Sequence, residues 1–476
     1  MPRIVIAWFR RDLRVHDHPA LTAAVEDGDV VIPLFVLDEQ LLARHANPAN
    51  RRWFLRESLV ALRDGLSERG SSLRVLDGRP RDVVPAFARE TGAAGVYVTR
   101  DATPYGRARD RAVAMSLRAT RSELRAKRGQ YVQEPDELAT AAGAPFRVFT
   151  PYHRAWAARE RRAPLAPPDR IPAPAGARAD DIPDHGRPSA DPALIPTPGE
   201  PAARERLARW IRGGLATYHE TRNRLDLDGT SRLSQDLRFG LLSATEVVDR
   251  ADLPGEGAQA FVRELAWRDF YAHVLWHRPE TARAPFQPAL RAMPWRDDPP
   301  AFEAWRNGRT GYPVVDAAMR QLHASGFLPN RARMIVASFL AKDLLLDPRL
   351  GEAEFMRHLT DGDPASNLGG WQWSAGTGTD PQPFVRVFNP VLQGTRFDPD
   401  GDYVRRWVPE LRGIEGRAVH EPWALPPEAR RELEYPERIV DHAAARERTL
   451  AAFASAGAVR SDEGSPATRR TDANGR

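Results

Sequence analysis

The sequence Ile4-Val-Ile-Ala-Trp-Phe9 is an unbroken apolar run, and the basic segment Arg10-Arg-Asp-Leu-Arg14 follows it directly. A short apolar run without polar alternation is typical of a strand buried on both faces of a sheet. Three further short apolar runs follow, at residues 30–37, 73–76 and 96–99. Helical patterns lie next to these runs, at residues 19–26, 49–68, 81–91 and 105–128. This alternation predicts an α/β region with a doubly wound parallel sheet.

The chain of 476 residues is longer than a single hydrophobic core usually supports, so we expect two domains. Residues 160–201 are rich in Pro, Ala, Arg and Asp and lack a periodic apolar face, which predicts an extended linker over the surface. Beyond them the pattern stays helical. We therefore expect an α/β plus all-α organisation, with an α/β domain at residues 1–131, a linker at 132–200, a large helical domain at 201–457 and a disordered tail at 458–476.

The composition excludes several classes of function. The chain has no Cys, which excludes disulfides, thiolate metal sites and Cys nucleophiles, and no metal site is predicted. No apolar run has the length of a membrane span, and the first one is too short for a signal peptide, so we expect a cytoplasmic protein without a membrane partner. The net charge of +5 is compatible with nucleic acid as a partner. No G-x-G-x-x-G follows the first strand, so that dinucleotide-binding motif is absent.

Hydroxyl side chains gather in Gly229-Thr-Ser-Arg-Leu-Ser234, just before an apolar periodic segment. Hydroxyls and backbone N–H groups at the start of a helix can bind a diphosphate. Taken alone, the motif is more typical of an ordinary helix cap. A second cap is predicted at Ser243-Ala-Thr-Glu246, where the Ser hydroxyl and the Glu carboxylate would both bind free N–H groups.

Three motifs in the second half carry side chains suited to a ligand site. On a helix, Glu264, Trp267 and Arg268 would share one face, although a half-buried indole beside an ion pair is an equally good interpretation. Asn330 and Met334 are one helical turn apart. The stretch Asp361-Gly-Asp-Pro-Ala-Ser-Asn-Leu-Gly-Gly-Trp-Gln-Trp373 combines acids, an amide, glycines and indoles, which indicates a recognition surface.

In order and spacing, these motifs resemble those of the cryptochrome/photolyase family over nearly the full length of the chain. The resemblance is carried by FRRDLR (9–14), GTSRLS (229–234), ELAWRDFY (264–271), GYPVVDAAMRQL (311–322), NRARM (330–334), DGDPASNLGGWQW (361–373), FNPVLQG (388–394) and VHEPW (419–423). Within the family, the chain is similar to the bacterial class I photolyases that repair cyclobutane pyrimidine dimers. The resemblance implies an N-terminal α/β antenna domain and a helical domain that holds a U-shaped FAD, reduced in the active state, beneath a cavity in a basic surface.

The resemblance assigns flavin contacts residue by residue. Asn367 corresponds to the residue that faces flavin N5, where an amide favours the reduced forms; plant-type sensory cryptochromes have Asp there, so Asn367 favours repair. The acids Asp361 and Asp363 correspond to contacts of the ribityl and isoalloxazine groups. The remaining FAD contacts implied are Tyr218, Thr230, Ser231, Arg232, Leu233, Ser234, Glu264 and Arg268.

The same resemblance implies that double-stranded DNA carrying the lesion is the partner. Trp267 and Trp373 would stack on a flipped-out dimer, Glu264 and Asn330 would hydrogen-bond the thymine edges, and Met334 would pack on the dimer. Arg222, Arg331 and Arg386 correspond to cavity positions that bind DNA phosphates. For any one of these arginines, ion pairing within the protein is an equally good interpretation.

Two features bear on light harvesting and electron transfer. Trp371 and Trp295 correspond to the first and last members of the family's chain of three tryptophans, but the middle position is Pro348. Either another aromatic residue substitutes, with Trp373 or Trp305 as candidates, or flavin photoreduction is slow in this protein. Gly106 stands where pterin-binding members have Glu, and Pro104-Tyr-Gly-Arg107 resembles the deazaflavin-binding members. The resemblance therefore implies 8-hydroxy-5-deazaflavin as antenna, with methenyltetrahydrofolate or an empty pocket as alternatives; Arg51, Asp101 and Arg238 correspond to its polar contacts.

The sequence thus predicts light-driven repair of cyclobutane pyrimidine dimers by a monomeric photolyase. A blue-light-sensing cryptochrome without repair activity and a photolyase for 6-4 lesions are the alternatives. The 6-4 relatives have a His pair where this chain has Pro329-Asn330, which disfavours that substrate.

Overall fold

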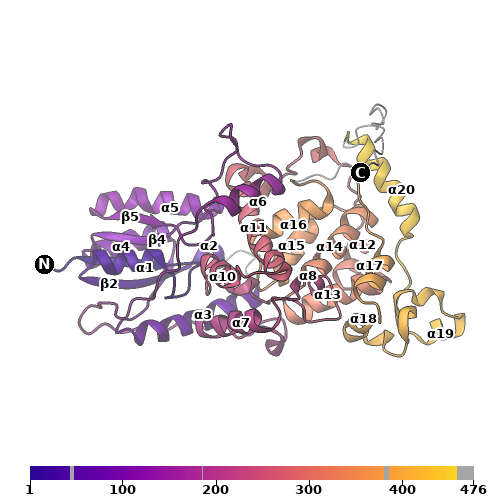
Figure 1. Cartoon of the computed structure of the whole chain (residues 1–476), viewed down its shortest axis with the longest axis horizontal. Coiled ribbons are helices and arrows are strands. Elements are labelled where there is room, and N and C mark those ends of the chain that lie inside the picture. Colours follow the sequence, from indigo (N-terminus) through magenta and orange to yellow (C-terminus); the bar gives the residue numbers. More distant parts are fainter. Residues whose placement is uncertain (43–47, 185, 380–384, 458–476) are drawn as a thin grey trace, which may run out of the picture.

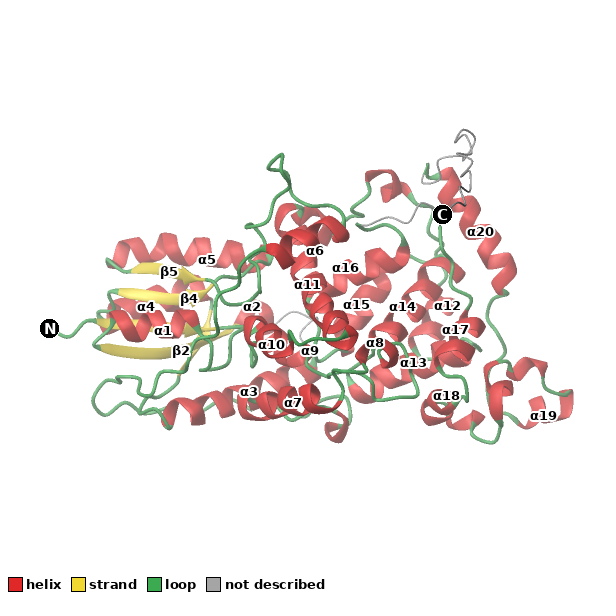
Figure 2. Ribbon diagram, viewed as in Figure 1, coloured by secondary structure: helices red, strands yellow, loops and turns green. Residues whose placement is uncertain are grey.

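Strand β1 (Ile4–Phe9) is the central strand of a five-stranded sheet in which all neighbours are parallel. The computed structural model describes residues 1–42, 48–184, 186–379 and 385–457. The strand order is β3-β2-β1-β4-β5, and Figures 1 and 2 show the sheet at one end of the molecule. The other strands are β2 (Val30–Asp38), β3 (Arg74–Gly78), β4 (Gly95–Thr99) and β5 (Glu123–Lys127).

Helices cover both faces of this sheet, which confirms the doubly wound prediction. Alternate residues of β1 separate the two sides: Val5 and Phe9 belong to the core beneath α1 and α3, whereas Ile6 and Trp8 belong to the core beneath α4 and α5. Side chains of a strand point alternately to opposite faces, so this strand must be apolar throughout. The helices of this region are α1 (Pro19–Asp27), α2 (Glu39–Leu42), α3 (Ala49–Ser67), α4 (Pro80–Thr91) and α5 (Pro104–Leu117).

The prediction of one helix over residues 105–128 is wrong. Helix α5 ends at Leu117, a short 3-10 turn follows, and Arg121 adopts a left-handed backbone with φ of 59°. The chain then forms β5, an edge strand that pairs with β4. The charged sequence of β5 suits a helix locally, but pairing with the sheet determines its conformation.

The segment after the sheet packs on both domains, because Trp156 Nε1 donates a hydrogen bond of 2.9 Å to Asp269 of the helical domain, whereas later residues contact the sheet. It contains α6 (Phe149–Ala158) and a 3-10 turn at Pro192–Leu194, and the rest of residues 159–191 that the structure describes is extended. Pro172 O accepts a hydrogen bond of 2.7 Å from Val31 N, and Asp180 Oδ2 accepts one of 2.9 Å from Val75 N. These bonds place the extended chain against β2 and β3.

The second half is helical, and its core forms around α13 (Pro313–Ser325), α14 (Asn330–Ser338) and α15 (Pro348–His358). None of the helices in the described part of the chain combines the length and apolar character that a bilayer crossing needs. The predicted disordered tail, residues 458–476, lies outside the described residues. The other helices are α7 (Glu200–Gly213), α8 (Tyr218–Thr221), α9 (Ser234–Phe239), α10 (Ala244–Ala251), α11 (Glu256–His277), α12 (Pro299–Arg306), a π-helical turn (Phe339–Asp343), α16 (Pro364–Ala375), α17 (Pro390–Phe397), α18 (Asp402–Trp407), α19 (Pro427–Glu432) and α20 (His442–Ser455).

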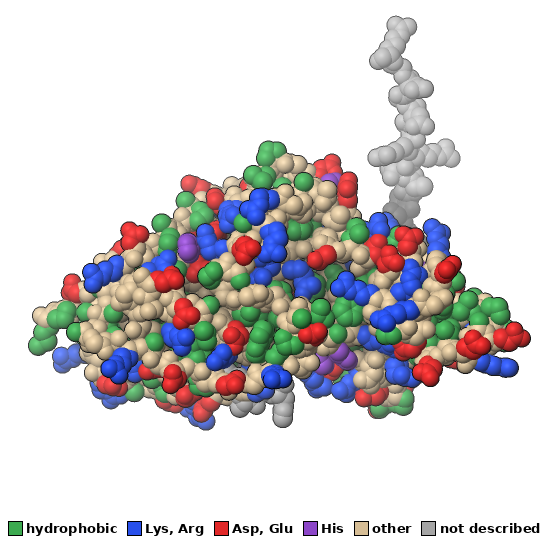
Figure 3. All heavy atoms as spheres, turned by 90° about the horizontal axis from the view of Figure 1, so that it is seen from below, with side chains coloured by type: hydrophobic (Ala, Val, Ile, Leu, Met, Phe, Trp, Pro, Cys, Tyr) green, Lys and Arg blue, Asp and Glu red, His purple; other side chains and the backbone are tan. Residues whose placement is uncertain are grey.

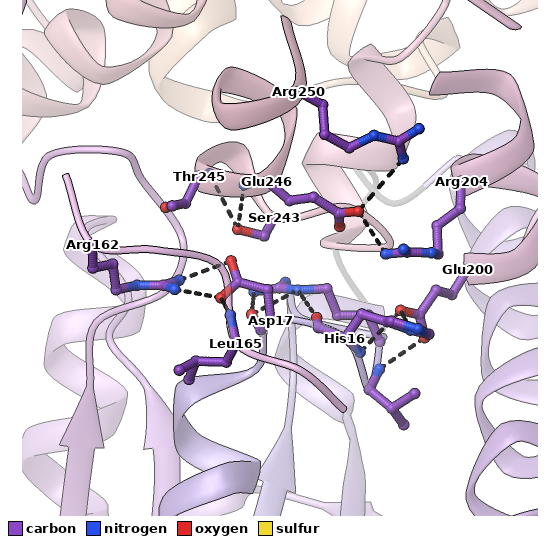
Figure 4. Close-up of polar contacts among 12 residues, drawn as sticks. His16, Asp17, Arg162, Leu165, Glu200, Arg204, Ser243, Thr245, Glu246 and Arg250 are labelled. Carbon is purple, nitrogen blue, oxygen red and sulfur yellow. Dashed lines mark hydrogen bonds and ion pairs between the residues drawn. The ribbon is translucent and has the colours of Figure 1, made fainter. Parts of the chain in front are cut away.

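Buried carboxylates join the two halves, as Figure 4 shows. Glu200 accepts hydrogen bonds of 2.8 Å from Val15 N and 3.0 Å from His16 N, which connects the loop after β1 to the start of α7. Asp17 pairs with Arg162 of the extended segment. The segment 10–17 is therefore held from both sides.

The cap predicted at Ser243 is half correct. Ser243 Oγ accepts hydrogen bonds from the backbone N–H groups of Thr245 (3.1 Å) and Glu246 (3.3 Å). The Glu246 carboxylate does not return to the Ser243 N–H, because Oε1 pairs with Arg204 at 2.6 Å and faces Arg250 at 3.7 Å. Here the ion pairs with α7 and within α10 replace the second half of the capping box.

Candidate functional site

A cavity of about 500 Å³ lies in the helical domain between α8, α9, α11, α14 and α16. Its volume is in the range typical of small-molecule and cofactor sites. Most of the predicted site residues line it, although they come from segments far apart in the sequence. They are Tyr218, Arg222, Thr230, Ser231, Arg232, Leu233, Ser234, Arg238, Glu264, Trp267, Arg268, Asn330, Arg331, Met334, Asp361, Asp363, Asn367, Trp371 and Trp373. The predicted residues that do not line it are Arg51, Asp101, Trp295 and Arg386.

Close approach of α11 and α16 forms one wall of the cavity. A Cβ at Gly369 would lie 2.1 Å from Tyr271 Cδ1, so only glycine allows α16 to pack this closely on α11. The same packing brings Trp373 and Glu264 to one cavity. Gly369 therefore serves contact between helices, whereas Gly370 has open space around it and lines the cavity.

Glu264 forms an ion pair with Arg222 in the cavity wall. Burial raises the pKa of Glu264, and the Arg222 guanidinium opposes this rise. Burial and the nearby Glu264 carboxylate also raise the pKa of Tyr218, which therefore remains a neutral phenol. Arg222 thus has a partner within the protein, as the alternative interpretation of the sequence allowed.

Trp267 is held from behind by an aromatic ring that the sequence analysis did not identify. Phe149 of α6 stacks on the indole with ring centroids 3.7 Å apart and planes at 7°. Phe149 is buried, whereas Trp267 is half-buried and lines the cavity. Nearby, Asn330 is exposed and its Nδ2 lies 3.7 Å from Met334 Sδ, one turn along α14. A flat apolar surface and an amide therefore face the same space.

The two predicted acids differ in their environment. Asp361 accepts a hydrogen bond of 2.7 Å from Arg333 Nη2 through Oδ2, while its buried Oδ1 has no partner among the described residues. Asp363 caps α16 by accepting hydrogen bonds from the N–H groups of Ala365 (3.1 Å) and Ser366 (3.0 Å), and it pairs with Arg11 of the loop after β1.

Burial alone would raise the pKa of Asp363, but Arg11 and Arg238 outweigh it and hold the pKa well below its usual range. Arg268, another predicted cofactor contact, donates a hydrogen bond of 2.9 Å to Gln130 O. Asp363 and Arg268, which both line the cavity, thus connect the helical domain to the α/β domain.

Residues 230–234 line the cavity, and their main chain is open to a ligand there. Arg232 has a φ of 52°, a left-handed conformation that is uncommon for a non-glycine residue. Its side chain lies on the Phe327 ring, with Cζ 4.0 Å from the ring centroid, and donates a hydrogen bond of 3.1 Å to Leu194 O. The guanidinium is thus bound by the protein, and the main chain and the Thr230 and Ser231 hydroxyls remain to meet a ligand.

Asn367 and Trp371 lie on successive turns of α16 and are both buried. The Asn367 amide donates a hydrogen bond of 3.1 Å to Glu352 O. Burial and the nearby Asp347 raise the pKa of Glu352 to about 7. A Cβ at Gly351 would lie 2.0 Å from Trp371 Cη2, so α15 must present glycine to this indole.

Trp371 has two aromatic neighbours among the described residues, Phe355 with ring centroids 4.9 Å apart and the indole of Trp305. The centroids of the two indoles are 6.1 Å apart with planes at 74°, and Trp305 Nε1 donates a hydrogen bond of 3.0 Å to Val336 O. Pro348 begins α15, while Trp295 packs in a separate hydrophobic cluster with Phe453. Of the two substitutes predicted for Pro348, Trp305 is the one whose ring contacts Trp371 among the described residues.

Arg331 is a cation without a carboxylate partner among the described residues. It donates two hydrogen bonds, of 3.1 and 2.9 Å, to Asn223 Oδ1. Burial, Arg222 and Arg386 lower its pKa to about 10. Arg386 is exposed and does not line the cavity. Figure 3 shows acidic and basic side chains interspersed over the face in view, so the overall charge does not identify a binding face by itself.

The predicted antenna residues lie at the junction of the domains. Arg51 Nη1 donates a hydrogen bond of 2.8 Å to Leu359 O, and Arg238 Nε donates one of 2.8 Å to Gly362 O. Asp101 pairs with Arg109 at 3.3 Å. Burial and nearby Arg11 lower the pKa of Arg238 to about 9.

Several residues of the cavity and its support were missed by the sequence analysis. Phe149 lies in the region predicted to be linker, and Arg11 lies in the other domain. Arg333 is within the recognised NRARM motif, whose alternating Arg residues were a usable signal. Arg11 lies within the FRRDLR motif, but its contact with Asp363 depends on tertiary packing, as does the role of Phe149, which no local sequence pattern indicates.

Comparison with known proteins agrees with this arrangement. Residues 5–174 match the family described as DNA photolyase, and residues 261–455 match the FAD binding domain of DNA photolyase. A deoxyribodipyrimidine photo-lyase from Streptomyces griseus is 43% identical, over 94% of this chain and 98% of that protein.

Two solved structures are similar along nearly the whole chain. A bacterial class III photolyase from Agrobacterium tumefaciens has a TM-score of 0.90 at 40% identity, covering 96% of this chain and 98% of its own. A cryptochrome from Synechocystis sp. PCC6803 has a TM-score of 0.85 at 30% identity, covering 94% and 99%. The class I assignment therefore stays a prediction. With both family domains, this cavity and these relatives, the chain belongs to the DNA photolyase and cryptochrome family.

Proposed function

We propose that this protein uses light to split cyclobutane pyrimidine dimers in DNA, with reduced FAD as the electron donor. The observation that carries the proposal is the convergence of Glu264, Trp267, Asn330, Met334 and Trp373 on the same cavity as the predicted flavin contacts. A flat, partly apolar cavity with a few amide and carboxyl groups suits two stacked pyrimidines better than it suits an extended strand.

The cavity fits FAD by the chemistry of its walls. The buried oxygen Asp361 Oδ1 and the buried nitrogen Trp371 Nε1 have no hydrogen-bond partner among the described residues, which indicates that a bound group satisfies them. The backbone of residues 229–234 and the hydroxyls of Thr230 and Ser231 would hold the diphosphate. Asn367 and Asp363 would contact the isoalloxazine and ribityl groups. When bound and illuminated, reduced FAD would supply an electron to the dimer and recover it after the cyclobutane ring has opened, so the repair has no net change of oxidation state.

The protein's own residues orient the lesion. Trp267, fixed by Phe149, and Trp373 would stack on the flipped-out bases and recover part of the cost of unstacking them. Glu264, oriented by Arg222, would place its carboxyl group at the pyrimidine edge, while Asn330 offers an amide to the base edge. Met334 would pack against the dimer, and the closed apolar surfaces would keep water from the reacting ring.

Binding to the DNA backbone is assigned to arginines around the cavity. Arg331 is the strongest candidate, because its partner is the neutral Asn223 side chain and neighbouring arginines destabilise its charge. A phosphate would relieve that repulsion. Arg386 is exposed outside the cavity and could contact a more distant phosphate. Arg222 is already paired with Glu264 and would act mainly by orienting that carboxyl group.

For reduction of oxidised flavin, the proposed route runs from Trp371 to Trp305, since these indoles contact each other edge to face. For light harvesting, the proposed antenna is 8-hydroxy-5-deazaflavin bound near Arg51, Asp101 and Arg238. A Cβ at Gly106 would lie 2.1 Å from the Asp101 carboxyl carbon, so a glutamate at position 106 would displace Asp101. That packing supports the deazaflavin assignment over methenyltetrahydrofolate. Extraction and mass spectrometry of the bound chromophores would decide between them.

The proposal is tested by separating flavin binding from repair. We expect Glu264→Ala and Trp267→Ala to retain FAD yet lose repair of a thymine-dimer oligonucleotide under light. The wild-type protein, loaded with reduced FAD, is the reference. If both variants repair dimers at the wild-type rate, the lesion site is not where we place it, and if both lose flavin, the two residues have structural roles instead.

A further inference from the structure

Outside the photolyase cavity, two helices bring His323, Glu354 and His358 together. His323 lies in the last turn of α13, and Glu354 and His358 occupy the last two turns of α15. His358 Nε2 lies 2.9 Å from Glu354 Oε1, and His323 Nε2 lies 3.9 Å from the same oxygen. The imidazole rings are tilted by 37°, with their centroids 4.3 Å apart. We propose that these three side chains bind a divalent transition-metal ion, with zinc as the best fit.

The spacing suits one ion. All three ligand atoms lie within 4.8 Å of one another. Bonds of about 2.0–2.2 Å from zinc to nitrogen or oxygen require ligand atoms roughly 3–4 Å apart, which a small rotation of the imidazoles achieves. Two imidazoles and one carboxylate favour zinc over magnesium or calcium, which prefer oxygen ligands.

An unsatisfied atom is the second sign of a ligand. His323 Nε2 is buried and has no hydrogen-bond partner among the described residues. Unpartnered buried polar atoms are rare in native proteins and indicate an unseen ion or water.

The neighbouring arginines define how the carboxylate would bind. Arg357 Nη1 donates a hydrogen bond of 3.1 Å to Glu354 Oε2, which leaves Oε1 for the ion. An outer hydrogen bond of this kind orients a carboxylate ligand. Arg306 Nε lies 3.9 Å from Oε1 and adds positive charge beside the site. We therefore expect weaker binding than at a site surrounded by acids, and the ion would be lost to a chelator.

The position of the cluster suggests what a bound ion would do. Helix α13 leads directly to Phe327, and α15 leads directly to Asp361, both of which line the cavity. The two connections already touch, because Thr360 N donates a hydrogen bond of 2.8 Å to Gly326 O. An ion bound by His323, Glu354 and His358 would crosslink the C-terminal ends of these helices. It would thereby restrict the motion of the two segments that lead from them to the cavity.

The test uses untagged, FAD-loaded protein that has been treated with a chelator and dialysed. Titration with zinc chloride, followed by isothermal calorimetry, should show one ion per chain. His323→Ala should weaken zinc binding by more than about tenfold. His277→Ala is the matched control, since His277 Nε2 is also buried without a partner but belongs to no such group in the described chain; its zinc binding should equal that of the wild type. The flavin absorption spectrum checks that each variant is folded.

A variant that is expected to bind zinc more tightly provides an independent test. Arg306→Gln removes positive charge beside the carboxylate and keeps the Arg357 hydrogen bond that orients it, so zinc should bind more tightly and raise the midpoint of thermal unfolding further than in the wild type. The proposal is overturned if the wild-type protein binds no zinc at the concentrations tested, or if His323→Ala binds it as tightly as the wild type. Weaker zinc binding in Arg306→Gln would also contradict it.

Discussion

Phe149 stacks on the face of Trp267 with ring centroids 3.7 Å apart, although the two residues are separated by more than a hundred positions in the sequence. The contact crosses from α6 to α11 and fixes the plane of the indole at the cavity wall. An indole held in this way can stack on a base without first losing its own rotational freedom.

The first prediction follows from this contact. Ordering a side chain on binding costs about 0.5–1.5 kcal/mol, so Phe149→Leu, which frees the indole of Trp267, should weaken binding of dimer-containing DNA by about two- to tenfold. Binding of undamaged DNA should be unchanged, since it depends on the backbone. Fluorescence anisotropy with matched oligonucleotides measures both. Phe87→Leu, a change at a buried ring in α4, is the control; equal effects from the two variants would show that only general stability is involved.

A second prediction concerns the phosphate contact assigned to Arg331. Each phosphate that a protein neutralises contributes about 0.9 to the slope of log affinity against log salt, so Arg331→Gln should lower that slope by about 1. The decrease in DNA affinity should be the same for damaged and undamaged duplexes. The control is Arg349→Gln, because Arg349 already pairs with Asp347 on the surface. An unchanged slope in Arg331→Gln would exclude a phosphate contact.

A third prediction tests the route of electron transfer. Trp305→Phe should reduce the rate of flavin photoreduction to a small fraction of the wild-type rate, because phenylalanine is not readily oxidised. It should also cost about 1 kcal/mol of folding free energy through the lost hydrogen bond to Val336 O. Trp295→Phe should photoreduce at nearly the wild-type rate. Absorption spectroscopy under blue light with an added electron donor measures both rates of photoreduction. If Trp295→Phe is slow and Trp305→Phe is as fast as the wild type, the route runs through Trp295 and not through Trp305.

A fourth prediction concerns pH and the Asp363–Arg11 pair. Because the folded protein holds the pKa of Asp363 below its ordinary value of 3.8, the pair stabilises the folded state at pH values above about 4. That stabilisation is lost as the pH falls toward the lowered pKa. Asp363→Asn keeps the helix cap but removes the charge, and we expect it to cost about 3 kcal/mol at pH 7.

The measurement for this prediction is the midpoint of thermal unfolding at several pH values. The gap between the wild type and Asp363→Asn should be largest near neutral pH and should shrink as the pH falls below about 4. Asp180→Asn, which removes a more exposed pair with Arg74, should produce a smaller change. A gap that is constant over this pH range would show that the Asp363 charge is not the cause.

The sequence allowed the fold class and the main cavity residues to be predicted, because both depend on local patterns. Apolar runs such as Ile4–Phe9 identify buried strands, and the motifs that contain Glu264 and Asn367 carry the family resemblance. The edge strand Glu123–Lys127 was missed because its charged residues suit a helix and only sheet pairing makes it a strand.

The contacts between distant segments could not be predicted. Nothing near Phe149 indicates that it lies against Trp267, and nothing near His323 indicates that it meets Glu354 and His358. No metal site was predicted, and the absence of Cys excluded thiolate sites alone, whereas the proposed site is assembled from His and Glu side chains of two helices. Such sites depend on helix packing that a single sequence does not specify.

The most direct test of the central claim is repair of a synthetic thymine-dimer duplex by the wild-type protein with reduced FAD. The absorbance of the restored thymines is followed under blue light and in the dark. The account predicts recovery in the light and none in the dark. No recovery in the light, with FAD bound and fully reduced and the dimer duplex bound, would contradict it and would favour a 6-4 lesion or a sensory role.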